Sequence, residues 1–145
     1  MAEGLAGVTR LGFDTAPIIY FVEEHPQYLS RLTLAFDSVA AGRLLGITST
    51  LTLAEVLVQP IRRGAVELQR AYSDRLMHSE YFETRPIDSA VAQRAAELRA
   101  SFNIRLPDAL QLATALVAGC DALLTNDRAL QKIHAIRILL LDDLD

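Results

Sequence analysis

The chain has 145 residues, of which 51% are hydrophobic and 22% are charged. This composition fits a single compact domain over residues 1–145 and excludes a disordered chain, because disordered chains lack the apolar surface that offsets the entropy cost of ordering. The formal charge of −4, from 14 basic and 18 acidic residues, also excludes the strong basic excess that is typical of many nucleic-acid binders.

Short apolar runs alternate along the chain with longer stretches of helical periodicity. The apolar runs predict strands at Val8–Phe13, Leu44–Thr48, Tyr81–Arg85, Asp121–Thr125 and Arg137–Leu141. The stretches between them predict helices that start near Pro17, span Pro26–Gly42, run from Ser49–Thr52 to a break at Pro60 and Gly64, and span Ala65–Met77, Asp88–Phe102, Arg105–Gly119 and Arg128–Ile133. Because strands without polar alternation have both faces covered, we expect an α/β fold: a three-layer α/β/α sandwich around a central, mostly parallel sheet of four or five strands.

One apolar stripe leaves two interpretations open. Leu29, Leu32 and Phe36 recur at helical spacing. Together with the region of Tyr72 they form either part of the core or the face of a dimer. Periodicity does not separate these interpretations, because both bury the same side of the helix.

Four acidic residues lie where predicted strands end or where the following helices begin. Asp14 ends the first strand, and Asp127 follows the fourth. Glu55 lies in the first turns of the helix after the second strand, and Asp108 stands at a helix start. Taken singly, an aspartate in such a place is more commonly a turn or N-cap residue. Ligands of open parallel sheets bind outside the carboxyl ends of the strands, so we expect the four side chains to gather at that edge.

Carboxylates that gather in this way need compensation. Two unit charges about 4 Å apart repel by roughly 4 kcal/mol at an effective dielectric constant near 20. A bound cation or shared protons would relieve that repulsion. Because the ligands are all oxygen atoms, the pattern favours a hard cation, Mg²⁺ or Mn²⁺, and predicts metal-assisted hydrolysis of a phosphodiester.

Four segments, in this order, resemble the PIN-domain family and in particular the VapC-type toxin ribonucleases. The resemblance extends over nearly the whole chain and rests on Phe13–Tyr20, Ser49–Leu57, Leu106–Ala115 and Leu124–Leu130. It implies a catalytic metal site made of Asp14, Glu55, Asp108 and Asp127. In that site Asp14 and Asp108 are the firmest ligands of Mg²⁺ or Mn²⁺, while Glu55 and Asp127 hold the ion through water or orient the attacking water.

The resemblance also assigns polar residues around the acids. It implies that the hydroxyls of Thr125 and Thr15 contact a water or a phosphate oxygen, and that Asn126 is the polar residue of the last segment. Substrate binding further needs cations beside the acids. The candidate contacts for RNA phosphates are Arg62, Arg63, Arg105 and Arg128, although a charged helix face is more commonly just solvated.

The activity implied by the resemblance is that of a metal-dependent endoribonuclease, which hydrolyses single-stranded RNA and is the toxin of a type II toxin–antitoxin pair. The implied partners are a second copy of the chain, in a homodimer, and a small antitoxin protein. A non-catalytic PIN-like module that binds RNA or a protein is the alternative, and retention of all four acids favours the enzyme. A receiver-like phosphoacceptor at Asp14 is least favoured, because Lys132 is the only lysine.

The compartment follows from a few absences in the sequence. Cys120 is the only cysteine, which excludes an internal disulfide and is compatible with a reducing compartment. The first residues have neither a basic region nor an apolar run of secretory length, and no stretch approaches the roughly 20 apolar residues that span a bilayer. We therefore expect a cytoplasmic protein with no membrane partner.

Overall fold

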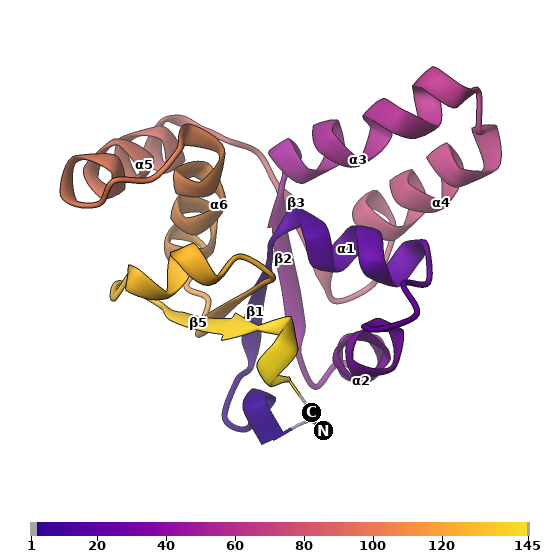
Figure 1. Cartoon of the computed structure of the whole chain (residues 1–145), viewed down its shortest axis with the longest axis horizontal. Coiled ribbons are helices and arrows are strands. Elements are labelled where there is room, and N and C mark those ends of the chain that lie inside the picture. The colour runs from indigo at the N-terminus through magenta and orange to yellow at the C-terminus, as the bar shows by residue number, and fades with distance from the viewer. Residues whose placement is uncertain (1–2, 145) are drawn as a thin grey trace.

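A single parallel sheet forms the centre of the molecule. The computed structural model describes residues 3–144, and its strands are β1 (Arg10–Phe13), β2 (Leu45–Ser49), β3 (Phe82–Arg85), β4 (Ala122–Thr125) and β5 (Arg137–Leu140). The strands lie in the order β3-β2-β1-β4-β5, and every neighbouring pair is parallel (Figure 1). The chain therefore starts at the middle of the sheet, builds one half outward, and returns to build the other half from β4.

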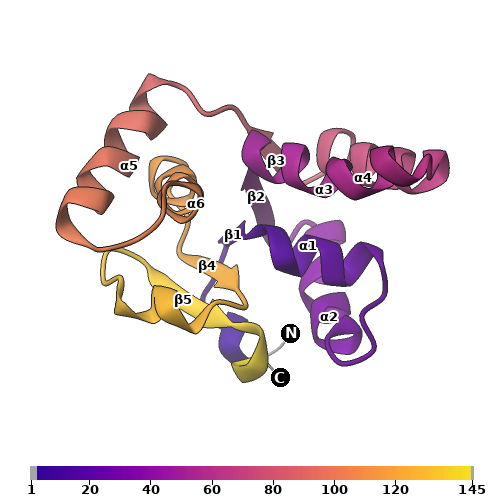
Figure 2. The ribbon, with the colours of Figure 1, turned by 45° about the horizontal axis from the view of Figure 1, so that its top comes forward.

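Helices cover both faces of this sheet, which confirms the predicted α/β fold with a parallel sheet. One face carries α1 (Thr15–Val22), α2 (Leu29–Ala40), α3 (Thr50–Arg63) and α4 (Val66–Met77), and the other carries α5 (Ser89–Ser101) and α6 (Leu106–Val117) (Figure 2). Short 3₁₀ turns are η1 (Glu3–Leu5), η2 (Arg128–Lys132) and η3 (Leu141–Asp143). Across residues 3–144, none of the helices combines the length and the apolar character needed to cross a membrane.

The two faces of the sheet bury separate apolar clusters. The cluster under α1–α4 contains Leu32, Phe36 and Tyr72, all of them buried. The Phe36 ring packs on Phe13 of the central strand, with the ring centroids 5.0 Å apart. Sequence periodicity did not decide whether this apolar stripe belongs to the core or to a dimer face. The structure places Leu32, Phe36 and Tyr72 in the core, whereas Leu29 is only half-buried.

Gly12 sets how closely α6 approaches the central strand. A Cβ atom at this position would lie 3.0 Å from the Cβ of Ala115 and 3.1 Å from a methyl group of Leu123. Contacts this short leave no room for a side chain, so glycine lets α6 lie directly on β1. The helix that carries Asp108 is thereby held against the strand that leads to Asp14.

Two helix boundaries differ from the sequence prediction. The predicted break at Pro60 is wrong, because α3 continues through this residue to Arg63 and ends only at Gly64, whose φ is +65°. Pro60 is buried on the same face as Val56, so packing of the apolar stripe holds the last turn despite the missing N–H. The helix predicted from Pro26 begins instead at Leu29, after turns in which His25 accepts backbone hydrogen bonds from Tyr28 and Leu29.

Candidate functional site

Asp14 lies at the junction between β1 and α1. Its backbone N–H extends the sheet by donating to the carbonyl of Leu124, at 2.9 Å. Its side chain is the N-cap of α1 and accepts a hydrogen bond from the N–H of Thr15, at 2.9 Å. The other carboxylate oxygen accepts a hydrogen bond of 2.8 Å from the hydroxyl of Thr125, which is fully buried at the end of β4. Asp14 is thus both a helix cap and a residue fixed at the meeting point of two strands.

The environment of Asp14 disfavours its ionised form. Burial raises the pKa of this carboxyl above its usual value of 3.8, and the negative charges of Asp108 and Glu55 raise it further. The hydrogen bonds from Thr125 and Thr15 act in the opposite direction. Burial has the largest effect, so this carboxylate is strained electrostatically in the absence of a cation.

Glu55 reaches the site from α3. The side chain of Ser49 caps that helix by accepting from the N–H of Leu51, which confirms one of the hydroxyl caps predicted for this segment. Glu55 therefore lies in the second turn, and its carboxylate accepts a hydrogen bond of 2.7 Å from the hydroxyl of Thr15. This bond joins α3 to the start of α1.

Asp108 reaches the site from the first turn of α6. An acidic residue there interacts favourably with the helix dipole. Its carboxylate also lies 3.5 Å from the guanidinium of Arg105. The Asp108 side chain is only 17% exposed, whereas that of Arg105 is 80% exposed, so the cation side of this pair faces solvent.

Asp127 follows β4 and serves a local role as well. Its carboxylate accepts from the N–H of Ala129 and caps η2, as expected for an aspartate that precedes a helical turn. Its own N–H donates to the hydroxyl of Thr125, at 3.1 Å. The amide of Asn126 points elsewhere, toward the hydroxyl of Tyr20 at 3.4 Å.

The structure brings all four acids to one cavity. This acidic pocket has a volume of about 300 Å³. Its lining includes Asp14, Glu55, Asp108 and Asp127, together with Thr15, Arg105 and Gln111. The acids come from four segments that are far apart in the sequence and meet where β1 and β4 lie side by side with their carboxyl ends together. In parallel sheets this is the place where the strand order reverses and ligands bind.

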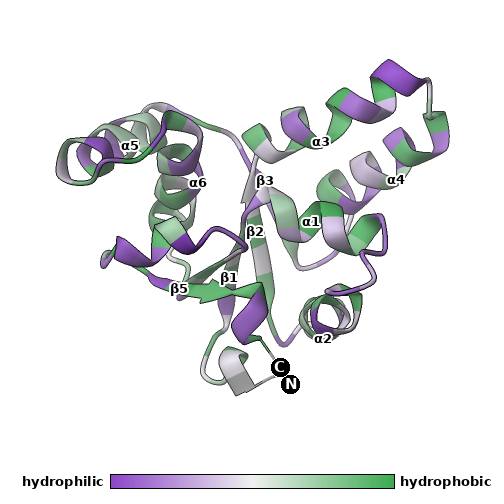
Figure 3. Ribbon diagram, viewed as in Figure 1, coloured by the Kyte–Doolittle hydropathy of each residue, from purple (hydrophilic) through white to green (hydrophobic). Residues whose placement is uncertain are grey.

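The arginines considered from the sequence are not equivalent. Arg105 lines the acidic pocket, whereas Arg62 and Arg63 lie in the last turn of α3, at its hydrophilic outer end (Figure 3). Seven residues of helix separate Glu55 from Arg62, a rise of about 10 Å. Arg128 is exposed and pairs with Asp142 at 3.2 Å. Thr125 and Asn126 lie behind the lining, in contact with Asp14 and Tyr20 respectively.

A buried polar cluster beneath the acidic pocket escaped the sequence analysis. Its members are Thr48, Ser49, Thr52 and Gln111, and all of them are nearly inaccessible to solvent. One signal was available: Gln111 lies three residues after Asp108 on a helix whose only other polar residue is Thr114, so Asp108 and Gln111 share one face.

The donor set of the pocket suits a hard divalent cation, since carboxylate oxygens are preferred by Mg²⁺ and Mn²⁺. Over residues 3–144, however, no three His, Cys, Asp or Glu side chains are grouped so that they could hold one ion together. Mg²⁺ commonly keeps several waters and takes only one or two protein carboxylates. The pocket therefore fits an ion with at most two direct protein ligands, the remaining acids acting through water.

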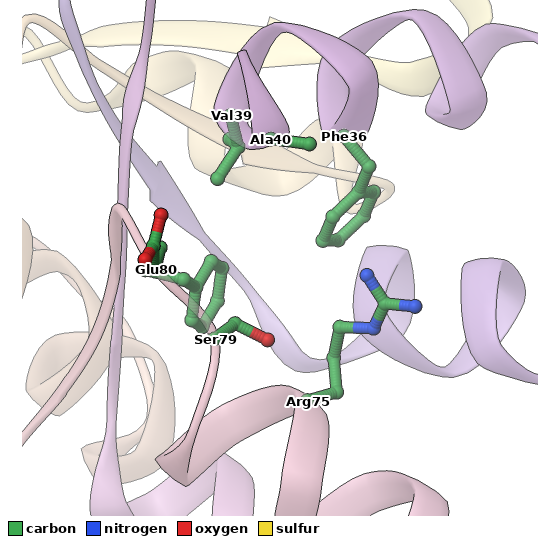
Figure 4. Close-up of a pocket in the computed structure, with 7 residues that line it drawn as sticks. Phe36, Val39, Ala40, Arg75, Ser79 and Glu80 are labelled. Atoms are coloured by element: carbon green, nitrogen blue, oxygen red, sulfur yellow. The ribbon is translucent and has the colours of Figure 1, made fainter. Parts of the chain in front are cut away.

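A second cavity, of about 230 Å³, lies between α2 and the segment that joins α4 to β3 (Figure 4). Its lining is largely apolar, with the rings of Phe36 and Phe82, and none of the four acids contributes to it. The guanidinium of Arg75 lies 5.7 Å from the centre of the Phe36 ring. A further cavity between α1, α2 and α4 also has Arg75 in its lining.

Comparisons with known proteins identify relatives of this chain. A sequence model of the PIN domain matches residues 13–136. No curated protein matches the chain. Among solved structures, VapBC2 from Rickettsia felis, bound to a DNA fragment from its promoter, is similar with a TM-score of 0.74 and 17% identity over 94% of this chain and 100% of that one. A toxin–antitoxin complex from Klebsiella pneumoniae has a TM-score of 0.67 and 24% identity over 92% and 98% of the two chains. VapBC-5 from Mycobacterium tuberculosis has a TM-score of 0.57 and 20% identity over 90% and 98%. At these identities the similarity establishes the fold alone.

Proposed function

This chain belongs to the PIN-domain family, and we propose that it is a divalent-metal-dependent endoribonuclease, the toxin of a toxin–antitoxin pair. The observation that carries the proposal is the gathering of four acids from separate segments around one cavity. Carboxylates around one cavity repel one another, and the charges of Asp108 and Glu55 add to burial in raising the pKa of Asp14. A function that uses a cation explains why the chain retains all four.

Each acid has its own part in the proposed reaction. Asp14 and Asp108 are the direct ligands of Mg²⁺ or Mn²⁺, because both are half-buried and firmly placed at the start of a helix. Glu55 is exposed and accepts from Thr15 through one carboxylate oxygen, which leaves the other oxygen to accept a proton from an attacking water, and Asp127 would hold the ion through water. When bound, the ion supplies a positioned water of lowered pKa and neutralises charge that develops on the phosphate.

Positive charge for the substrate comes from the rim of the pocket. Arg105 is largely exposed beside Asp108, where its guanidinium can leave the carboxylate and pair with a backbone phosphate. Thr15 lies in the same lining, where its hydroxyl contributes indirectly to positioning a water, by donating to the carboxylate of Glu55. We propose Arg62, Arg63 and Arg128 only as outer contacts for the RNA strand, away from the acidic pocket.

A nuclease assay with single-stranded RNA and Mg²⁺ or Mn²⁺ tests the proposal. Wild type should cleave, Asp14→Asn should lose at least about 100-fold in rate, and chelation of the metal should abolish cleavage. The matched control is Asp74→Asn, because Asp74 is exposed on α4, away from the acidic pocket. Equal cleavage by wild type and Asp14→Asn would remove the proposal.

A second candidate is a non-catalytic PIN-like module that binds RNA or a protein. It is favoured by the finding that, in the described part of the chain, no three acids are placed to hold one ion together. Calorimetry with Mn²⁺ separates the two candidates, since the enzyme binds the ion in the acidic pocket and the module does not. Loss of the binding heat in Asp14→Asn assigns the heat to this pocket.

We also propose an antitoxin as partner, because similar structures include toxin–antitoxin complexes. The two cavities that share Arg75 form the surface that we assign to this partner. Arg75, which both cavities share, offers a cation at its centre. Arg75→Glu should weaken the complex in a pull-down with the antitoxin, and Arg94→Glu on α5 is the control.

A homodimer is the remaining part of the proposal. Val58, Ile61 and Val66 are exposed apolar residues at the outer part of the α3–α4 hairpin, which extends beyond the sheet (Figure 1). Neighbouring exposed apolar side chains of this kind commonly mark a protein interface. The cytoplasmic location expected from the sequence stays a prediction.

A further inference from the structure

A chain of hydrogen bonds runs under the acidic pocket from α6 to Glu55. The side-chain nitrogen of Gln111 lies 2.7 Å from the hydroxyl oxygen of Thr52 and 3.1 Å from that of Thr15. The carbonyl oxygen of the same amide accepts a bond of 2.7 Å from the hydroxyl of Ser49. Thr15 in turn lies 2.7 Å from Glu55. Gln111 is only 4% exposed, so water does not substitute for these contacts.

Counting protons narrows the directions that these hydrogen bonds can take. Gln111 has two N–H protons, and they go to Thr15 and Thr52. The hydroxyl of Thr48 has one proton and two acceptors, the hydroxyl of Thr52 and the carbonyl of Phe13, each at 2.8 Å. The hydroxyls of Thr15 and Thr52 lie 3.1 Å apart, and either can be the donor. In the described residues 3–144, no buried side-chain nitrogen or oxygen lacks a partner, which agrees with this arrangement.

The direction of these hydrogen bonds has a consequence for Glu55. Thr15 accepts from Gln111, and its single hydroxyl proton goes to the carboxylate of Glu55 at 2.7 Å, which is a charged and closer acceptor than the hydroxyl of Thr52 at 3.1 Å. In this arrangement Ser49 donates to the amide oxygen of Gln111 and accepts from the N–H of Leu51, so the amide oxygen of Gln111 also has a partner. The rotamer of an exposed acid is thus set from inside the core.

We propose that Gln111 is a positioning residue, which orients Glu55 through the hydroxyl of Thr15. Gln111 lies one helical turn after Asp108 on α6, whereas Glu55 lies on α3. The hydrogen bonds therefore connect two acid-bearing helices that lie on opposite faces of the sheet. As a statement about catalysis, this inference rests on the proposed function. As a statement about the order of the Glu55 side chain, it does not.

The test is a double-mutant cycle with Gln111→Met and Thr15→Val. Gln111→Met keeps the length of the side chain and removes its polar atoms, and Gln93→Met on the exposed face of α5 is the matched control. Gln111→Met should lower kcat by about 10- to 100-fold and leave KM for RNA unchanged, because loss of an outer partner of an active-site ligand has effects of that size. The double variant should lose no more than the larger single loss.

Other outcomes overturn the inference. A structural role alone predicts a lower melting temperature, an unchanged kcat for the folded fraction, and losses that add in the double variant. If Gln111→Met does not fold, the inference is tested in wild type by the exchange of the Gln111 side-chain N–H protons with solvent. Rapid exchange of either proton would contradict the hydrogen bonds from Gln111 to Thr15 and Thr52. If wild type cleaves no RNA, the proposed function fails by itself. The inference is then judged by crystal structures, in which Glu55 should have one rotamer in wild type and several in Gln111→Met.

Discussion

Replacing Asp14 by asparagine should stabilise the metal-free protein and should remove most of the stabilisation of the fold by Mn²⁺. The carboxylate of Asp14 is disfavoured by burial and by the charges of Asp108 and Glu55. Asparagine has nearly the same shape and keeps an oxygen that can accept from the N–H of Thr15. What it loses is the acceptor for the hydroxyl of Thr125, because its second atom is an amide nitrogen.

The magnitude follows from these opposing effects. Burial of the Asp14 charge is the largest effect, and repulsion by Asp108 and Glu55 adds to it; two unit charges repel by about 2 kcal/mol at a separation of about 8 Å and an effective dielectric constant near 20. Loss of a hydrogen bond to a charged group costs about 1.5–3 kcal/mol. Relief from burial of the charge adds to the gain. We expect Asp14→Asn to be about 1–2 kcal/mol more stable without metal, which raises the melting temperature by about 3–6 °C.

Thermal melts with and without Mn²⁺ check both halves of this prediction. With Mn²⁺ at about 100 times its Kd, wild type should gain about 2.7 kcal/mol by mass action, and Asp14→Asn should gain far less. Asp121→Asn is the control, for which the opposite change in stability is expected. Its carboxylate accepts from the N–H groups of Thr9 and Arg10, and these bonds lower its pKa, so its replacement should destabilise the fold. A metal-free Asp14→Asn that melts at or below wild type refutes the repulsion argument.

The same reasoning gives a pH dependence with a definite sign. Because the pKa of Asp14 is raised in the folded state, the native protein takes up this proton before the unfolded chain does as the pH falls. The penalty from Asp14 is therefore fully present above the folded pKa and disappears as the pH falls toward 3.8. The difference in melting temperature between Asp14→Asn and wild type should narrow from pH 7 toward pH 4. A difference that stays constant over this range contradicts the assignment.

Three further predictions concern other parts of the molecule. Arg105→Ala should change the free energy of unfolding by less than about 1 kcal/mol, because the Arg105 side of its pair with Asp108 is solvent-exposed. The same change should raise KM for RNA and make KM less dependent on salt concentration. A salt dependence of KM equal to that of wild type argues against a phosphate contact. Gly12→Ala should destabilise the fold by about 1–3 kcal/mol in chemical denaturation, since its Cβ would lie 3.0 Å from that of Ala115, and full stability would show that α6 can shift. Ile61→Glu should convert a dimer into a monomer in sedimentation experiments with an unchanged circular dichroism spectrum, and a dimer that persists places the interface elsewhere.

Much of the fold could be predicted because its signals are local. Apolar runs without alternation indicate strands covered on both faces, and β2 and β4 lie within one residue of their predicted positions. Pro60 shows where local rules fail. A missing N–H in a helix interior usually ends the helix, but here the burial of Pro60 on the apolar face outweighs that loss.

The site was harder to predict because its geometry depends on strand order. The positions of Asp14 and Asp127 after apolar runs are visible in the sequence, but their proximity follows from the pairing of β1 with β4, which are separated by more than 100 residues. Which arginine faces the pocket depends on helix length and direction, so Arg105 could not be distinguished from Arg62. Gln111 was missed because a single polar residue in an apolar helix gives no indication of its partners.

The distribution of hydrogen-bond donors explains how the chain tolerates such a site before any cation binds. Three of the four acids accept hydrogen bonds from neutral donors, whereas Asp108 forms an ion pair. Asp14 and Glu55 accept from the hydroxyls of Thr125 and Thr15. Neutral donors reduce the repulsion without competing for the charge that a metal ion would neutralise, and they need not move when the ion binds.

Asp108 is the exception, because its partner is the cation Arg105, in an ion pair. A guanidinium held 3.5 Å from a carboxylate at the rim offsets part of the negative potential in the metal-free state. Once a divalent ion neutralises Asp108, the same guanidinium loses its partner and becomes available to a phosphate. Metal binding and substrate binding should therefore be coupled at Arg105, so that Mn²⁺ tightens the binding of a non-cleavable RNA analogue in wild type more than in Arg105→Ala. Equal tightening in both proteins, measured by fluorescence anisotropy, would show that Arg105 takes no part in the coupling.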